Sequence, residues 1–322
     1  MDQNVANIEI GPQYPKDNPF AARMRFHQSW YRAKILKVSF GHGPRKTSPS
    51  YYGNYLTQED GNQGLNFLTP QLGERIFSVV KQRLAENNGA IEPYRLLCNM
   101  LSSQPMCFNL FGPLVNDFGL AAALLKPLFP DEILEVTRVK LEFAPEPANE
   151  YLNDHTAFDA YVEYTALDGN KGFIGIETKL VEPFTLAEHE HAEYWNWSHQ
   201  EDAPWVKSTL SNLRDVKVNQ LWRDHLLGVA MQLHPKSSYK YGHFLVIYHS
   251  GDEACSQSVN LYRTLLKPAD RSFQAIKLDE LINWWQHSNA LNLEDKLWLR
   301  QFSIRYLELS ASEHECITKS NK

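Results

Sequence analysis

HTAFDAYVEYTALDGNKGFIGIETKL (residues 155–180) is the stretch that decides the fold. Apolar residues occupy alternate positions in two runs, at 158, 160, 162 and 164 and then at 174, 176 and 180. Such alternation is typical of β-strands with one face toward a core. Asp168-Gly169-Asn170 separates the runs and predicts a hairpin turn, in which Gly169 or Asn170 takes a positive φ.

Three charged residues stand on the other face of this hairpin: Asp159, Glu177 and Lys179. Residues that lie directly opposite each other in an antiparallel pair share a face. If the apolar even-numbered residues of both strands share one face, even-numbered residues must pair with even-numbered ones, so the loop between the strands must hold an odd number of residues. A loop of three residues, 168–170, places Asp159 opposite Lys179 and Glu177 on the diagonal. The pattern therefore predicts two carboxylates and one ammonium side by side.

This charge cluster has more than one interpretation. A cross-strand ion pair on a solvated face would contribute little to stability. Two neighbouring carboxylates would instead suit a hard divalent cation such as Mg²⁺, with the lysine stabilising negative charge at a phosphate. A glycosidase pair is less favoured, because Lys179 shares the face and no long aromatic platform adjoins it. Spacing alone leaves the ion pair and the metal site open.

The surrounding chain predicts the elements that would support the hairpin. A helix and then a strand precede the hairpin, and a helix and then a buried strand follow it. This order indicates an α/β fold with a mixed sheet flanked by helices. We expect helices at 69–89, 91–125 (broken by Pro105 and Gly112-Pro113), 211–234, 278–287 and 294–309, strands at 132–145 and 243–250, and a Trp-rich loop at 185–206.

Asp159, followed by Glu177-Thr178-Lys179 in the next strand, resembles the signature of the PD-(D/E)XK nuclease superfamily, whose members are restriction-endonuclease-like. The stretches SSQPMCFNLFGPL (102–114) and NQLWRDHLL (219–227) resemble a bacterial branch of it. Asp159 follows Phe158, where the signature has proline. The resemblance covers about half the chain and implies a restriction-endonuclease-like fold that acts on DNA, with RNA left open, in restriction, defence or repair.

The resemblance also implies roles for individual residues. Asp159 and Glu177 would ligate Mg²⁺, with Mn²⁺ as a substitute, together with the main-chain carbonyl of Thr178. Lys179 would orient or activate the attacking water. Gln220 stands where several members keep a glutamine near the metal. Arg223, one helical turn further on, would contact nucleic acid.

Several other polar residues are weaker candidates. Glu142 and Glu182 could supply a further ligand, and Gln104 and Asn109 could line the cleft or cap broken helical turns. The histidine-rich segment is set aside as a metal site, because His-x-His shares a face only on a strand and this stretch indicates loop or helix. That segment contains His189, His191 and His199 with Glu188, Glu190 and Glu193.

The N-terminal region is unusually basic. Between Asn18 and Gln58 it holds seven Lys and Arg and no acid, interleaved with aromatic residues; with +7 there and −6 overall, the rest of the chain carries −13. Such interleaving is typical of nucleic-acid binding, although an arm that packs its aromatics on the body would look the same. We expect phosphate contacts from Arg23, Arg25, Arg32, Lys34 and Lys37.

The 322 residues, 43% of them hydrophobic, predict a folded globular protein. Four scattered cysteines and an N-terminus without a signal-like pattern favour a cytoplasmic, non-membrane protein. We expect a basic, aromatic arm over 1–65 that is irregular apart from one short helix near 21–34. A nuclease core should follow over 66–250, with a C-terminal helical extension of the same domain over 251–322. A homodimer is expected only by analogy with enzymes that cut both strands. The alternative function is a nucleic-acid-binding or scaffold protein that keeps the fold without cutting.

Overall fold

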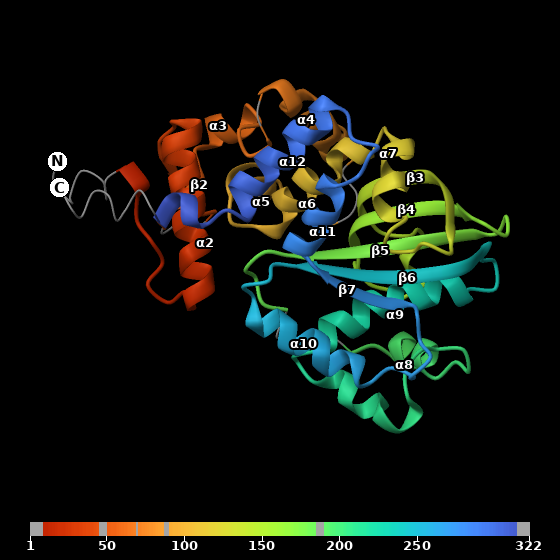
Figure 1. The fold of residues 1–322 in the computed structure, drawn as a ribbon. Helices are drawn as coiled ribbons and strands as arrows, with labels where there is room; N and C mark the ends of the chain where they lie inside the picture. Colours follow the sequence, from red (N-terminus) through yellow and green to blue (C-terminus); the bar gives the residue numbers. More distant parts are fainter. Residues whose placement is uncertain (1–8, 45–49, 69, 87–89, 185–189, 314–322) are drawn as a thin grey trace.

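A five-stranded mixed sheet forms the centre of the computed structural model, which describes residues 9–44, 50–68, 70–86, 90–184 and 190–313 (Figure 1). The strand order is β3-β4-β5-β6-β7; the first three are antiparallel, and β6 and β7 run parallel to β5. This confirms the predicted α/β class with a mixed sheet. The strands are β3 (Ile133–Phe143), β4 (Phe158–Ala166), β5 (Lys171–Lys179), β6 (Tyr239–Tyr248) and β7 (Phe273–Lys277).

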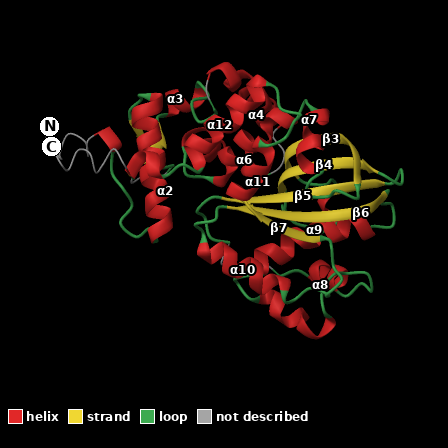
Figure 2. Ribbon diagram, in the orientation of Figure 1, coloured by secondary structure: helices red, strands yellow, loops and turns green. Residues whose placement is uncertain are grey.

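Helices cover both faces of this sheet (Figures 1 and 2). One apolar core lies between the sheet and the helices α4, α6, α7, α11 and α12, and a second lies between the opposite face and α8, α9 and α10. The bounds are α4 (Pro70–Glu86), α6 (Ser103–Phe111), α7 (Phe118–Leu125), α8 (Ala192–Ser198), α9 (Asn219–Leu233), α10 (Glu253–Arg263), α11 (Leu278–Gln286) and α12 (Leu293–Tyr306). Single-turn or irregular helices are η2 (Gly112–Leu114), η3 (Ala148–Glu150) and η4 (Lys207–Arg214).

The N-terminal region holds more regular structure than the irregular arm that was predicted, although a helix does lie where a short one was expected, near 21–34. It contains α2 (Pro19–Trp30), the π-helix η1 (Tyr31–Leu36), a hairpin of β1 (Phe40–His42) and β2 (Tyr51–Leu56), and the short helices α3 (Gln58–Asn62) and α5 (Pro93–Cys98) nearby. The helix α2 is tied to α12: Gln28 Nε2 donates to the carbonyl of Arg305 (2.7 Å), and His27 Nε2 lies 2.8 Å from the carbonyl of Ile304. The two ends of the described chain therefore support one another.

The C-terminal region completes the sheet. Its strand β7 pairs with β6, and α11 and α12 bury Trp285 and Trp298 in the first core. The sheet thus extends beyond residue 250, where the predicted nuclease core ended. The sequence pattern did not reveal β7, because five residues with mixed polarity carry a weak strand signal, or α8, because seven residues are too few for a clear helical period. The helix α10, with 11 residues, was not predicted either.

Strand β3 departs from the predicted alternation. Its buried apolar residues are Ile133, Val136, Val139 and Leu141, because the register with β4 shifts between 133 and 135 and again between 136 and 138. Each bulge adds a residue and moves the following side chains to the other face. Thr137 is therefore exposed, although Val139 and Leu141, two and four positions further on, are buried.

The β4–β5 hairpin has the predicted parity but another register. Thr165 pairs with Lys171 and Ala160 with Ile176, so paired numbers sum to an even value and the intervening loop has an odd number of residues. Five residues lie between the last pair, Thr165 and Lys171, where the prediction had three between 167 and 171. Within them Asp168 bonds to Asn170, and Ala166 N–H donates to the carbonyl of Asn170 (2.7 Å). Gly169 takes the expected positive φ, +81°.

Phe158 corrects a second detail of the hairpin. The alternation predicts that it packs with Ala160 and Val162, but its ring belongs to the core on the opposite face. A Cβ on Gly175 would come within 2.4 Å of that ring, so only glycine leaves room for it there. The regular pairing of β4 with β5 accordingly begins at Ala160, immediately after Asp159.

Among the described residues, no single helix combines the length and the apolar composition needed to cross a bilayer. One helix pair, Ser103–Leu114 with Phe118–Leu125, reaches those values only when two segments that meet at 112° are taken together.

Candidate active site

Three acidic residues lie in one row across the sheet, near the end where β5 stops. The pairs Leu141–Ala160 and Phe143–Phe158 bracket Glu142 on β3 against Asp159 on β4. The pair Ala160–Ile176 places Glu177 of β5 next to Asp159 on its other side. Asp159 is therefore opposite Glu177, and the predicted pairing with Lys179 is wrong by one step of two residues.

Asp159 is held by its neighbour strand. Its Oδ2 accepts hydrogen bonds from the main-chain N–H (2.8 Å) and the hydroxyl (2.7 Å) of Thr178. The Asp159 carboxylate thus accepts the hydrogen bond from Thr178 N–H that a main-chain carbonyl of β4 would accept if the regular pairing of β4 with β5 continued. The main-chain carbonyl of Thr178 was the predicted metal ligand; the structure places this residue directly beside Asp159.

Glu177, Lys179 and Gln220 form a buried triad. Glu177 Oε1 lies 3.0 Å from Lys179 Nζ and accepts from Gln220 Nε2 at 2.8 Å, while Lys179 Nζ donates to Gln220 Oε1 at 3.2 Å. The three side chains expose only 6–8% of their surface. This burial contradicts an ion pair on a solvated sheet face, because α9 covers the strands at this point.

The electrostatics of the row follow from burial. Burial, then repulsion by Glu177 and Glu142, holds the pKa of Asp159 well above its usual range. Burial disfavours the charged form of Lys179, but the attraction of Glu177, with Glu182 and Asp159, raises its pKa. Lys179 is therefore an ammonium at neutral pH, and the carboxylates lack full compensation from the protein.

Glu142 joins the site through an unusual backbone. Its φ is +50°, a left-handed value that costs a non-glycine residue about 1 kcal/mol or more. Its carboxylate accepts from Gln104 Nε2 at 2.6 Å. Burial and then the Glu177 carboxylate raise the pKa of Glu142 to about 7, although Gln104 and Arg95 act in the opposite direction. The weaker sequence candidate thus lies beside the predicted pair.

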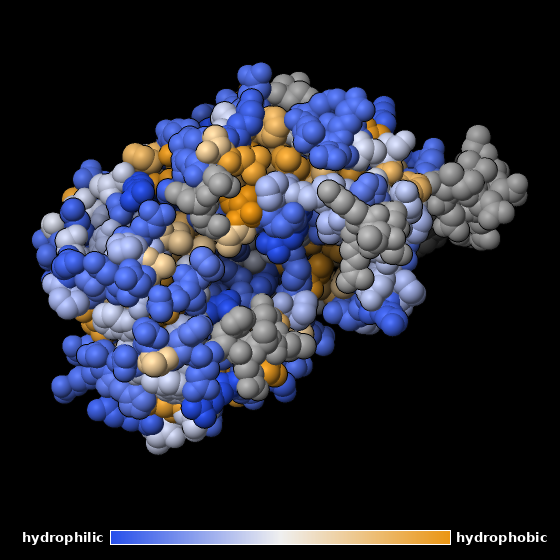
Figure 3. Space-filling view, turned by 180° about the vertical axis from the view of Figure 1, so that it is seen from behind, coloured by the Kyte–Doolittle hydropathy of each residue, from blue (hydrophilic) through white to orange (hydrophobic). Residues whose placement is uncertain are grey.

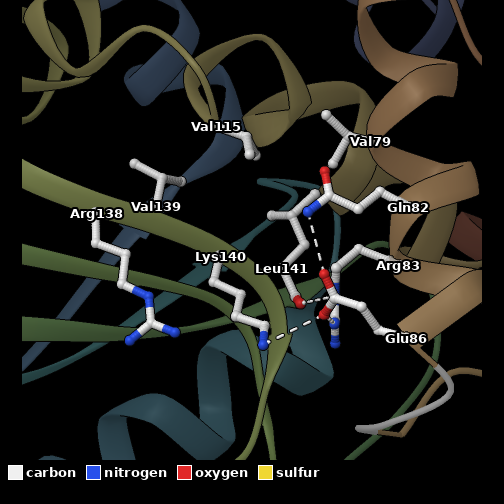
Figure 4. Close-up of a pocket in the computed structure, with 9 residues that line it drawn as sticks. All are labelled: Val79, Gln82, Arg83, Glu86, Val115, Arg138, Val139, Lys140 and Leu141. Atoms are coloured by element: carbon white, nitrogen blue, oxygen red, sulfur yellow. Dashed lines mark hydrogen bonds and ion pairs between the residues drawn. The ribbon is translucent and has the colours of Figure 1, made fainter.

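Arg83 holds this backbone from the far side of β3. It reaches from α4, donates to the carbonyl of Leu141 (2.7 Å) and pairs with Glu86 (Figure 4). It also donates to the carbonyl of Glu142 (2.9 Å). The small pocket in Figure 4, about 200 Å³, adjoins this contact and is bordered by Arg138 and Lys140. The guanidinium stabilises the strand end that turns Glu142 toward the acidic row.

The row lines a cavity of about 510 Å³. Figure 3 shows the molecule from behind, with a hollow lined largely by hydrophilic residues. Besides the row, its walls include Lys179 and Gln220 and, among other charged residues, Arg95 of α5 and Arg223 and Asp224 of α9. The cavity therefore combines carboxylates at its base with two arginines on its walls.

The other candidates divide between the cavity and the core. Glu182 lines the cavity, where its carboxylate accepts from Ser103 N–H at 2.8 Å. Asn109 does not line it: Asn109 is fully buried and joins α6 to Leu68 N–H (2.9 Å) and to Tyr306 (2.9 Å). Gln104 serves the site through its hydrogen bond to Glu142.

The histidine-rich segment contributes one residue to the cavity, His191. His199 is exposed and bonds to the carbonyl of Trp195 (2.7 Å), and Glu190 pairs with Arg214 (2.7 Å). Glu188 and His189 lie outside the described residues. Over the described ranges, no three His, Cys, Asp or Glu side chains already surround a common metal position. The carboxylates of the row are instead bonded to Thr178, Lys179, Gln220 and Gln104.

Two arginines of the basic N-terminal segment are built into the fold. Arg32 is 1% exposed and donates to the carbonyls of Glu9, Ile10, Val38 and Gly53, and burial lowers its pKa to about 10. The prediction that it contacts phosphate is wrong, because its guanidinium has no open side. Arg25 bonds to Asp17 (3.0 Å) and Asn54 (2.7 Å) between two tyrosine rings.

The remaining basic residues of that segment are more accessible. Arg23 pairs with Glu313 (2.8 Å) at 56% side-chain exposure, Lys34 pairs with Glu9, and Lys37 is exposed. Arg45 and Lys46 lie outside the described residues. Phosphate contact therefore stays a prediction for Arg23, Lys34 and Lys37.

Arg95 and Asp224 are charged residues of the cavity that sequence reasoning missed. Asp224 stands four residues after Gln220, a spacing that puts both on one helix face and could have pointed to it. Arg95 carried no such signal, because α5 meets the site only through tertiary packing. Both the arginine and the aspartate lie within the cavity wall.

Comparison with known proteins agrees with the geometry of the site. The model of the PD-(D/E)XK nuclease superfamily matches residues 15–308. No curated protein and no solved structure matches the chain. The matched range includes the acidic row, Lys179 and Gln220, and it extends over α2 and α12, well beyond the half of the chain that carries the sequence resemblance. The chain belongs to the PD-(D/E)XK nuclease superfamily.

Proposed function

We propose that the protein is a Mg²⁺-dependent nuclease that hydrolyses phosphodiester bonds of DNA, with Mn²⁺ as a substitute ion. The observation that carries the proposal is the group of the half-buried Asp159 and the buried Glu177 and Lys179, which line one cavity. Action in restriction, defence or repair, a cytoplasmic location and a homodimer belong to the same proposal and follow only from the superfamily.

The donor set suits a hard cation. Asp159 and Glu177 present carboxylate oxygens, the Thr178 carbonyl adjoins them, and these are the ligand types that Mg²⁺ takes. The raised pKa of Asp159 indicates that its anionic form lacks a compensating charge, which a divalent ion would supply. When bound, the ion would provide a water of lowered pKa and neutralise charge at the phosphate.

The chain's own residues account for the rest of the chemistry. Lys179 is positioned by Glu177 and Gln220 and lies over the ring of Phe184 at 4.9 Å, so its ammonium is held in one place without reorganisation. A fixed and largely buried ammonium stabilises the negative charge that develops on the attacking oxygen and the phosphate. Arg223 and Arg95 would hold neighbouring phosphates from the walls of the cavity.

The test is a cleavage assay on linear, supercoiled and single-stranded DNA and on RNA, with Mg²⁺, Mn²⁺ or a chelator. Asp159→Asn, Glu177→Gln and Lys179→Met should each reduce the rate of metal-dependent cleavage by about 10²-fold or more. Glu135→Gln is the control, since it removes an exposed carboxylate from β3, the strand that carries Glu142. Nucleic-acid binding without cleavage by the wild type would favour the non-cleaving alternative, and cleavage that survives in all three variants would refute the assignment of the site.

A further inference from the structure

The aromatic residues of the basic N-terminal segment do not share one environment. Trp30 and Tyr31 are buried in a small apolar core, so they serve the fold. Tyr51, the first residue of β2, is instead 53% exposed, and His42, the last residue of β1, is exposed as well. Packing on the body of the protein therefore explains the first two rings and not the second two.

His42 and Tyr51 form an aromatic platform with Tyr94 of α5. The ring of His42 lies nearly parallel to that of Tyr94, at 20° with 5.9 Å between the centroids, and it meets the ring of Tyr51 edge-on at 6.0 Å. The hydroxyl of Tyr94 donates to the carbonyl of His42 (2.5 Å), and His42 Nδ1 lies 2.7 Å from the carbonyl of Gly43. These contacts hold the rings in place before any ligand arrives, which reduces the entropy lost on binding.

The platform adjoins the cavity of the acidic row through α5. The helix starts beside that cavity, because Glu92 N–H donates to Gln104 Oε1 (3.4 Å) and Gln104 in turn bonds to Glu142. Arg95, which follows Tyr94 directly, is exposed and lines the cavity. A ligand that lies along the outside of α5 can therefore contact the platform with one part and the cavity with another.

A nucleobase is a planar ligand that fits this arrangement. Every base has a π-face that stacks on aromatic side chains, whatever the sequence. In a duplex both faces of a base are covered by its neighbours, whereas a single strand can turn a base out onto a protein ring. Arg95, beside the platform and on the cavity wall, offers a guanidinium to the phosphate that joins such a base to the rest of the strand.

We propose that the platform of His42, Tyr51 and Tyr94 stacks an unpaired base next to the scissile phosphate, and that the substrate is therefore a single-stranded segment of nucleic acid. The inference rests on the proposed function, which places the scissile phosphate at the acidic row. It narrows that function to strands whose bases are free to stack on the protein.

Binding of two single strands tests the platform without cleavage. One strand is oligothymidylate, and the other has the same length but abasic positions, so the phosphate charges are identical and only the bases differ. With a chelator present, fluorescence anisotropy of the labelled strands should show that the wild type binds oligothymidylate about tenfold more tightly than the abasic strand. Equal binding of both strands, or binding of neither, overturns the proposal.

Substitutions locate this preference on the platform. Tyr51→Ala and His42→Ala should each lower the preference for oligothymidylate by about fivefold or more, while Tyr51→Phe, which keeps the ring, should retain it. Trp284→Ala is the matched control and should also retain the preference, since it removes a 46% exposed ring from α11. An unchanged preference in both alanine variants overturns the proposal. Thermal melting shows whether each variant is folded, and if one is not, the other carries the test.

Cleavage separates this inference from the proposed function. In a protein that cleaves, kcat/KM on a single strand should fall by about fivefold or more in Tyr51→Ala and recover in Tyr51→Phe. Metal-dependent cleavage that is equal in the wild type and Tyr51→Ala, or faster on blunt duplex than on single strands, refutes the platform and leaves the nuclease standing. A base preference that disappears in Tyr51→Ala, in a protein that cleaves nothing, supports stacking at the platform and refutes the nuclease.

Discussion

The basic N-terminal segment and the acidic cavity are both dense in charge, yet their charges have opposite uses. In the segment, Arg25 and Arg32 are bonded to Asp17, Asn54 and main-chain carbonyls, so these charges hold the fold. In the cavity, carboxylates outnumber the cations that the protein sets against them, and one oxygen of Asp224 has no partner among the described residues. The comparison teaches that a cluster of like charges indicates a functional site only where the protein itself supplies too few opposite charges and hydrogen bonds to those side chains.

The physical difference lies in where the partners stand in the chain. The segment from 18 to 58 contains no acid, but Glu9, Asp17 and Glu313, just outside it or far away, reach its side chains. The acids of the cavity come from β3, β4, β5 and α9, and they converge without enough bases. Local composition therefore overestimated the free charge of the first region and underestimated that of the second.

The largest expected effect is on catalysis. Lys179→Met should reduce the rate of metal-dependent cleavage by about 10²–10³-fold or more, because it removes the fixed charge beside Glu177. Binding of uncleaved DNA to the variant should change far less than the rate. A variant that cleaves at the wild-type rate would make Lys179 a structural partner of Glu177, like the arginines of the segment.

Arg32→Met should give the next largest effect, on stability. The substitution leaves main-chain carbonyls such as those of Ile10 and Gly53 without their buried donor, so we expect the free energy of unfolding to fall by about 3 kcal/mol or more. Denaturant unfolding measures this. Arg23→Gln, which breaks one exposed pair, is the control and should change it by less than about 1 kcal/mol. An Arg32→Met variant that keeps its stability but binds DNA more weakly would show that Arg32 serves binding and not the fold.

A third effect is the pH dependence of stability in metal-free protein. The pKa of Glu142 is raised from its ordinary value of 4.5 to about 7, so the folded state holds its proton more tightly than the unfolded state does. Stability therefore falls as pH rises from about 4.5 to about 7, by on the order of 3 kcal/mol from this group. Glu142→Gln should flatten that part of the curve, and Mg²⁺ should oppose the fall in the wild type. If the free energy of unfolding of Glu142→Gln fell with pH as steeply as that of the wild type, the raised pKa of Glu142 would be refuted.

The smallest expected effect concerns the accessible cations of the basic segment. If Arg23 and Lys37 each bind a phosphate, the double substitution to Gln should reduce the slope of log K against log salt by about 0.9 for each phosphate that is no longer neutralised. DNA affinity at several salt concentrations measures this. An unchanged slope would assign these residues to packing or solubility, and the whole segment would then be structural.

The sequence predicted the residues of the hairpin better than their pairing. Alternation identified the strands and the parity of their register, because these depend on neighbours along the chain. The loop was longer than predicted, with five residues between Thr165 and Lys171, and Phe158 left its predicted face because Gly175 offered space for its ring. Asp159 and Glu177 still lie side by side, since a shift by two residues keeps every side chain on its face.

What the sequence determined by itself was the class of fold, the hairpin and the residues Asp159, Glu177, Lys179 and Gln220, because periodicity and a short signature are local properties. Only the tertiary structure decided that Glu142, Arg95 and Asp224 reach the same cavity and that Arg32 does not contact solvent. These outcomes depend on bulges, on a left-handed backbone and on contacts between distant segments, which no local pattern specifies.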